Sequence, residues 1–191
     1  GLSATPSKHL SIEASFYVQR LQNKIEFLQV GPDFFAANRG EQDSLGFEAL
    51  ARSSYGRFTG YLWGAFNYSI SGEQQNPPPL YPNLTGALGL DMDIHEAYVH
   101  LHGRIRVVGP RGPSQSNVYL NDGLSYELPT FATADLVLTS KGLHLFGPRA
   151  ETYFTAMVRN VTATRFTEPS FGGFDQPNIG QSFWLECKQS F

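Results

Sequence analysis

Hydrophobic and polar residues alternate along much of this chain, most clearly between Glu96 and Val108. Successive side chains of a β-strand point to opposite faces, so this alternation predicts a strand with one polar and one apolar row. The apolar row is expected to be buried, which leaves the polar row as either a solvated exterior or the wall of a pocket. The polar row contains Glu96, Tyr98, His100, His102, Arg104 and Arg106.

The same period of two predicts strands in most other parts of the chain, with turn residues between them. The longest regular one runs from Arg57 to Ile70, where apolar or small residues occupy the even positions. Asn121-Asp-Gly and Ser140-Lys-Gly are typical of hairpin turns. Helical patterns are limited to two short candidates, at Asp33 to Asn38 and at Ser44 to Ser53. Further strands are predicted at residues 12–21, 24–30, 45–51, 151–166 and 183–191.

These strands predict an all-β, antiparallel fold in a single domain over residues 1–191. We expect a β-barrel, comparable in architecture with lipocalin-like, dirigent-like and cyclase-type barrels, because Gly60 and Gly64 sit at alternate positions where a sheet could curl. A β-sandwich or jelly roll is the alternative. The stretch at about 71–93 is rich in proline and glycine and is expected to be a long loop.

Composition and charge narrow the possible partners. The 14 Lys and Arg residues are balanced by 17 Asp and Glu, with no basic run, so a nucleic-acid partner is not expected. No apolar run reaches the ~18 residues of a transmembrane helix, and the first residues lack a signal-peptide pattern. The sequence therefore predicts a soluble chain without a membrane span, in a trimmed, mature form.

Three Asn-x-Ser/Thr sequons, at Asn67, Asn83 and Asn160, favour glycosylation in a eukaryotic secretory pathway. Chance occurrence in a chain rich in serine and threonine is the alternative. Cys187 is the only cysteine, which excludes an internal disulfide. Its place in an apolar row predicts a buried, inert thiol.

The polar row also offers the groups of an active site. Glu96, Tyr98, His100, His102 and Arg104 would supply a base, proton donors, an imidazole that titrates near neutrality and a cation. Such groups suit cofactor-free cyclisation, isomerisation or dehydration, and the sequence carries no motif for a dinucleotide, phosphate-loop, hydrolase or zincin site. The sequence therefore favours an enzyme of the cyclase, isomerase or lyase kind that needs no cofactor.

The same strand offers a candidate metal site, because His100 and His102 would project from one of its faces. A third ligand could come from nearby acidic or histidine residues. The two arginines in the same row would repel a cation, so no metal is predicted. The candidate third ligands are Asp91, Asp93, His95 and Glu96.

Aromatic residues could form the wall of a pocket for an apolar organic molecule. A non-catalytic alternative uses Tyr61 and Trp63 as a platform in a carbohydrate- or lipid-binding module of the lectin or lipocalin kind. The overall expectation is a secreted barrel that takes an apolar small molecule, with a homodimer possible from face-to-face association. The predicted ligand-binding residues are Tyr61, Trp63, Phe66, Tyr68 and Tyr153.

Overall fold

The structure is a computed structural model, and it describes residues 1–30, 33–71, 81–95, 98–170 and 173–190. Within these residues the chain forms eleven strands and one short helix. The elements are β1 (Leu2–Ser7), β2 (Leu10–Val30), β3 (Asp33–Tyr55), β4 (Phe58–Ser71), β5 (Leu84–His95), β6 (Val99–Val108), α1 (Gln115–Leu120), β7 (Phe131–Ser140), β8 (Glu151–Arg159), β9 (Thr167–Glu168), β10 (Gln176–Pro177) and β11 (Ser182–Ser190).

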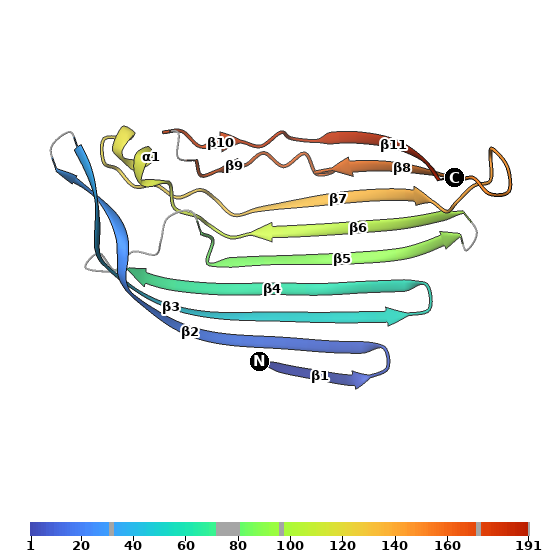
Figure 1. The fold of residues 1–191 in the computed structure, drawn as a ribbon, viewed down its shortest axis with the longest axis horizontal. Coiled ribbons are helices and arrows are strands. Elements are labelled where there is room, and N and C mark those ends of the chain that lie inside the picture. Colours follow the sequence, from blue (N-terminus) through green and yellow to red (C-terminus); the bar gives the residue numbers. More distant parts are fainter. Residues whose placement is uncertain (31–32, 72–80, 96–97, 171–172, 191) are drawn as a thin grey trace.

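Nine strands form one antiparallel sheet in the order β1-β2-β3-β4-β5-β6-β7-β8-β11, so strands that follow each other in the sequence are neighbours in space (Figure 1). β9 and β10 lie in the chain segment that joins β8 to β11, and they form a separate two-stranded sheet. The predicted all-β, antiparallel class is confirmed. The nine described strands do not close on themselves, because β1 and β11 are the two edges of the sheet.

The connections at the two ends of the sheet differ in length. At one end, residues 8–9 and 56–57 are all that separates β1 from β2 and β3 from β4, and residues 141–150 join β7 to β8. At the opposite end, residues 109–130 join β6 to β7 and include α1, and residues 160–181 join β8 to β11 and include β9 and β10. We call these the short-turn end and the long-loop end.

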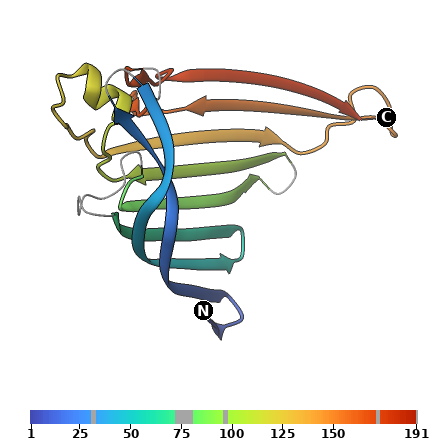
Figure 2. The same ribbon diagram turned by 60° about the vertical axis from the view of Figure 1, so that its left-hand side comes forward.

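β2 and β3 are much longer than the other strands, with 21 and 23 residues. Their pairing shifts register between Leu21 and Lys24, next to Asn23, whose φ of 57° lies in the left-handed region. Such an irregularity bends a hairpin. Beyond it the hairpin leaves the direction of the other strands and crosses the long-loop end of the sheet (Figures 1 and 2).

The strand register places polar and apolar rows on opposite faces of the whole sheet, because residues paired across antiparallel strands share a face. We call them the polar face and the apolar face. The polar face carries Glu13, Tyr17, Glu48, Arg52, Tyr61, Trp63, Asp91, His100, His102, Arg104, Arg106, Asp135, Tyr153 and Lys188. The apolar face carries Ile12, Phe16, Phe47, Leu62, Phe66, Leu88, Ile105, Leu136, Leu138, Phe154 and Leu185.

On the polar face, tyrosine rings lie flat on glycines of the neighbouring strand. Tyr17 covers Gly46 and Tyr61 covers Gly89, and a Cβ added at either glycine would collide with the ring. Both glycines are buried by this contact. A ring placed over a glycine pins strand register, because a slip by one residue would move the ring off its seat.

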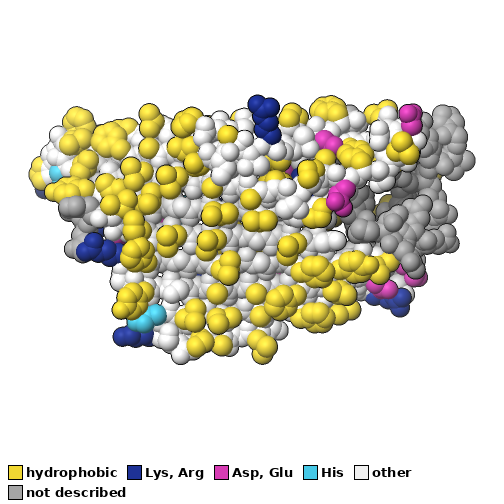
Figure 3. All heavy atoms as spheres, turned by 180° about the vertical axis from the view of Figure 1, so that it is seen from behind, with side chains coloured by type: hydrophobic (Ala, Val, Ile, Leu, Met, Phe, Trp, Pro, Cys, Tyr) yellow, Lys and Arg dark blue, Asp and Glu magenta, His cyan; other side chains and the backbone are white. Residues whose placement is uncertain are grey.

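The apolar face is exposed, which corrects the expectation that the apolar rows are buried. Leu62 is 61% exposed and Phe16 is 65% exposed, and Figure 3 shows apolar side chains spread over the strands with few charged ones among them. The chain exposes 13418 Å² in all. A compact soluble monomer of 21.2 kDa would expose about 9,100 Å². The sheet therefore does not bury its apolar side chains within the described residues.

Several predicted elements differ from the observed ones. The stretch expected to be a loop at 71–93 is shorter, since β5 begins at Leu84 and residues 72–80 lie outside the described residues. The expected hairpin around Asn121 is instead the end of α1, and both predicted helices lie inside β3. In the described part of the chain, no helix has the length and apolar character needed to cross a membrane.

Candidate functional site

The long loops are held together by a buried arginine at the long-loop end. The Arg111 side chain is 2% exposed, and its Nε lies 3.5 Å from Glu168 Oε2. Its guanidinium donates to the Thr167 carbonyl at 2.6 Å and lies 4.8 Å from the centre of the Phe131 ring. Phe131 in turn stacks on Phe166 at 3.7 Å. One side chain thus joins the 109–130 connection, β7 and the 160–181 connection.

A second set of polar contacts joins the same two connections. Asn117 on α1 donates from Nδ2 to Asp175 Oδ1 at 2.8 Å, and the Tyr126 hydroxyl donates to Asp175 Oδ2 at 2.8 Å. Ser114, the N-cap of α1, donates to the Ser170 carbonyl at 2.6 Å. Burial, and then the hydrogen bond to Asp175, raise the pKa of the Tyr126 phenol, so it remains a donor at neutral pH.

We call these two connections the docked loops. Sequence reasoning missed Arg111 and Asp175, because each lies in a segment that looks like an ordinary turn or loop. The turn Gly109-Pro-Arg-Gly-Pro marks where Arg111 is held, but nothing in it indicates a partner near residue 168. The docked loops present a preformed surface at one end of the sheet.

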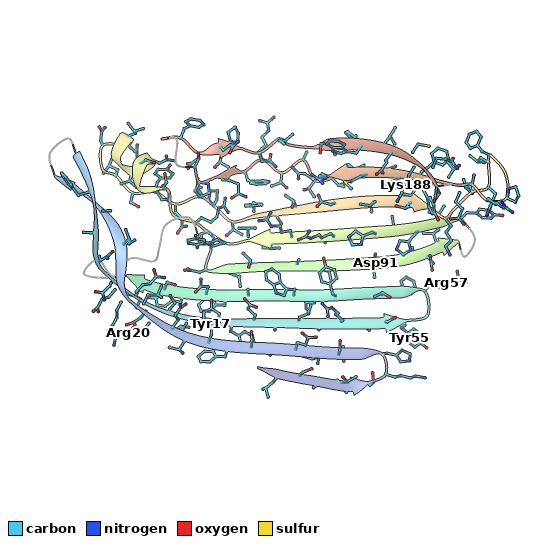
Figure 4. The ribbon with its side chains drawn as sticks, in the orientation of Figure 1. Tyr17, Arg20, Tyr55, Arg57, Asp91 and Lys188 are labelled. Carbon is cyan, nitrogen blue, oxygen red and sulfur yellow. The ribbon has the colours of Figure 1, made fainter. Side chains whose placement is uncertain are left out.

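At the short-turn end the polar face carries a cluster of carboxylates and imidazoles. Asp91 Oδ1 lies 2.8 Å from His102 Nδ1 and 3.5 Å from His100 Nε2. Asp93 Oδ1 lies 3.2 Å from His100 Nδ1 and 3.5 Å from Lys141 Nζ. Figure 4 shows Asp91 on β5 near this end of the sheet.

This cluster links the ends of β5, β6 and β7 through side chains. His100 lies near both Asp91 and Asp93, and Asp91 lies near both His100 and His102. The two histidine side chains are partly exposed, at 45% for His100 and 34% for His102. Among the described residues, no group of three or more His, Cys, Asp or Glu side chains is arranged to hold a metal ion. The arrangement ties neighbouring strands together.

The predicted catalytic residues are only partly brought together. His100, His102 and Arg104 share the polar face of β6, while Tyr98 precedes that strand and is 56% exposed. Glu96 lies outside the described residues. The exposed row therefore forms part of a broad, open wall.

The predicted ligand-binding aromatics are divided between the two faces of the sheet. Tyr61 and Trp63 lie on the polar face of β4, and Tyr153 lies on the same face of β8, where its hydroxyl donates to Glu151 at 2.5 Å. Phe66 and Tyr68 lie on the apolar face and are 42% and 38% exposed. These five side chains do not meet in one pocket.

The three sequon asparagines lie in different surroundings. Asn67 is on the polar face of β4, and Asn83 immediately precedes β5. Asn160 is buried at 4% exposure, with φ of 52°, and its amide bonds to the Thr164 backbone N–H at 3.0 Å and carbonyl at 2.9 Å. A structural role thus explains Asn160 without a glycan. Cys187 is exposed on the apolar face, which corrects the expectation of a buried thiol.

The family model described as "TonB dependent receptor-like, beta-barrel" matches residues 1–161. The chain belongs to this family. No curated protein matches the sequence.

Solved structures of similar fold are bacterial receptors and transporters. The ferric yersiniabactin uptake receptor FyuA from Yersinia pestis is 16% identical, with a TM-score of 0.75 over 97% of this chain and 28% of that one. The copper transporter OprC is 17% identical, with a TM-score of 0.72 over 96% and 29%. The ferripyoverdine receptor of the outer membrane of Pseudomonas aeruginosa is 10% identical, with a TM-score of 0.70 over 95% and 25%. The chain thus spans less than a third of the length of each of these proteins.

The family assignment overturns the expected function. The prediction of a cofactor-free cyclase, isomerase or lyase is wrong, because the chain belongs to a receptor barrel family. The alternative of a lectin-like or lipocalin-like binding module is wrong for the same reason. The lipocalin or dirigent architecture is wrong for the same reason. The polar row resembled an active site because a strand with one polar face shows the same alternation whether or not that face carries out catalysis.

The expected location and partners are also wrong. A eukaryotic secretory location conflicts with a match to a family whose similar solved structures come from bacteria. The predicted partner was an apolar small molecule, and no membrane span was expected. Both expectations conflict with the family match and with the similar fold of a receptor that lies in the outer membrane and binds ferripyoverdine. The sequence pattern misled because an apolar row looks the same whether a protein core or a lipid phase solvates it.

Proposed function

We propose that this chain forms part of the wall of an outer-membrane β-barrel that imports a metal complex. The nine-stranded sheet is one arc of a larger closed barrel, with the apolar face toward lipid and the polar face toward the lumen. The observation that carries this proposal is the exposed apolar face, which lies opposite a continuous polar face.

Strand length supports a membrane-spanning arc. A tilted strand needs about 9–11 residues to cross the hydrocarbon layer. β6 and β7 each have 10 residues, and β4 has 14. Closure through further strands would also pair the edges that β1 and β11 leave open, as a barrel requires in lipid.

The difference between the two ends of the sheet supports an orientation. Outer-membrane barrels have short turns on the periplasmic side and longer loops on the outside. The short-turn end is therefore periplasmic, and the docked loops face the medium. There they would form part of the surface that first meets the imported molecule.

Transport of a metal complex is the activity that similar receptors support, since their printed names include ferric yersiniabactin uptake and copper transport. The polar face contributes side chains to the lumen and none of the described ones is arranged as a metal site of its own. A metal held within a carrier molecule would need no protein ligands, which is consistent with that arrangement.

The test is fractionation of bacterial cells that make the protein containing this chain. We expect it to sediment with the outer membrane, to resist extraction by urea and to dissolve in detergent, because its apolar face is solvated by lipid. A peripheral outer-membrane protein is the control. Release of the folded protein into the aqueous fraction by urea alone would refute the proposal.

A further inference from the structure

We propose that the apolar face carries a seat for one phospholipid acyl chain, at the short-turn end of β7, β8 and β11. This proposal rests on the proposed function, since it requires that the apolar face meets lipid. A groove of about 390 Å³ lies there. Its lining residues come from four strands that follow one another in the sheet.

The groove arises because small residues stand between large ones in two adjacent rows. Ala156 is paired with Leu138 on one side and with Leu185 on the other. In the next row, Ser140 is paired with Val99, and Phe154 with Cys187. Ala156 and Ser140 lie diagonally, so the low floor runs obliquely across β7 and β8.

At this floor a side chain replaces the backbone partner that the β7–β8 ladder no longer supplies. The β7–β8 ladder ends at Thr139 and Thr155, one residue before the groove floor reaches Ser140. There the Phe154 backbone N–H donates to Ser140 Oγ at 2.9 Å in place of a backbone carbonyl. The Phe154 N–H is thus satisfied, so the apolar chain of a lipid would not face an unpaired backbone donor from this residue.

The shape and chemistry of the groove suit an acyl chain. Its wall side chains remain partly exposed, at 41% for Leu138, 45% for Phe154 and 87% for Leu185, so an occupant would cover apolar surface that is now open. Glu186 and Thr155 border the groove but belong to the polar rows of β11 and β8. The groove is also continuous with the apolar face, where lipid is the neighbour at the highest concentration.

The occupant is assigned to phospholipid, because the groove lies at the short-turn end and therefore in the periplasmic leaflet. A flexible chain can follow an oblique, open groove, whereas a rigid planar ligand needs an enclosed pocket.

The test uses the protein in vesicles of phosphatidylethanolamine that carries a photoactivatable diazirine in one acyl chain. After irradiation, adducts are mapped by mass spectrometry of peptides. We expect adducts around Phe154 and Cys187 to exceed those around Ala49 and Ala51, on the apolar faces of β3, by about fivefold. Equal labelling of the two regions would overturn the proposal.

A variant in which a large side chain fills the groove can be compared with a matched variant outside it. Ala156→Trp should reduce the adducts near Cys187 by about fivefold, while Ala134→Trp, on the same face but outside the groove, should leave them unchanged. Unchanged adducts in Ala156→Trp would also overturn the acyl-chain seat. If Ala156→Trp fails to fold, the labelling ratio in the unmodified protein still decides the question.

Cys187 separates this proposal from the proposed function. It is the only cysteine of this chain, and a membrane-impermeant maleimide whose adduct is mapped to the Cys187 peptide reports on its surroundings directly. Protection of Cys187 together with uniform lipid labelling would refute the seat alone. Rapid reaction of Cys187 in intact vesicles would show that this face meets water, and both proposals would then fail.

Discussion

Replacement of Arg111 by methionine should release the docked loops from each other. Methionine keeps an unbranched apolar stem but removes the guanidinium that contacts Thr167, Glu168 and the Phe131 ring. The prediction concerns the equilibrium between the docked and open loops. The barrel strands should remain folded, since their ladders do not include this side chain.

The magnitude follows from the individual contacts. A short hydrogen bond from a charged donor is worth about 1.5–3 kcal/mol. The ring contact adds about 0.5–2 kcal/mol, and the ion pair adds at most about 1 kcal/mol because Glu168 is 42% exposed. Methionine also removes the desolvation cost of a buried cation, so we expect a net loss of about 2–3 kcal/mol. That corresponds to roughly a 30- to 150-fold shift toward the open loops.

Hydrogen exchange of backbone amides measures this shift directly. Amides such as Arg111 N and Leu128 N, which bond to each other's carbonyls, should exchange faster by that factor in Arg111→Met. Arg165→Met is the control, because Arg165 is an exposed arginine of the same pair of loops. A change of less than about threefold in Arg111→Met, or an equal change in both variants, would refute the reasoning.

Three further substitutions test other contacts. Gly89→Ala should destabilise the sheet by about 1–3 kcal/mol in urea unfolding because the Tyr61 ring must leave its seat; the same cost in a Tyr61→Ala background would contradict this coupling. Tyr126→Phe should weaken loop docking by about 1 kcal/mol. The raised pKa of Tyr126 predicts that its contribution is complete below the usual phenol pKa and is lost as pH rises through the folded value. The protection of loop amides, measured relative to their intrinsic base-catalysed exchange, should therefore fall at alkaline pH in the unmodified protein but not in Tyr126→Phe. Asn160→Ala should loosen residues 160–164 by about 2 kcal/mol, seen as local proteolysis, whereas a purely glycan-bearing asparagine would leave this turn intact.

The alternation of polar and apolar residues identified the strands well. It could not show whether a protein core, water or lipid surrounds each face of the sheet. The predicted strand from Arg57 to Ile70 is β4, Phe58–Ser71, and the polar row of His100 and His102 lies on one face of β6 as expected. A half-buried strand of a soluble protein and a lipid-facing strand of a barrel have the same period. Alternation alone therefore predicts a protein core for the apolar rows, although lipid would solvate such rows equally well.

Glycines and turn residues led to wrong predictions at two places, where they lie inside a strand or at the end of a helix. Gly86 and Gly89 suggested a loop, but they lie within β5, where the Tyr61 ring covers Gly89. Asn121-Asp-Gly does contain two residues with positive φ, Asp122 at 54° and Gly123 at 75°. They follow the end of α1 and do not close a hairpin, because left-handed residues serve both purposes.

Site residues were harder to predict than strands, because their partners are distant in the sequence. Arg111 acquires its role from Thr167 and Glu168, which a single sequence does not connect to it. Asp91 and His102, by contrast, were both singled out, since they are close in sequence on adjacent strands.

The accessibility of single cysteines tests the assignment of the two faces most directly. In a Cys187→Ser background, Leu62→Cys would probe the apolar face and Ser15→Cys the polar face, since both side chains are exposed. In intact outer membranes, Leu62→Cys should react with a lipid-soluble maleimide and resist a charged one, while Ser15→Cys should react with the charged reagent after the membrane is made permeable to it. Rapid reaction of Leu62→Cys with the charged maleimide would contradict a lipid-facing sheet.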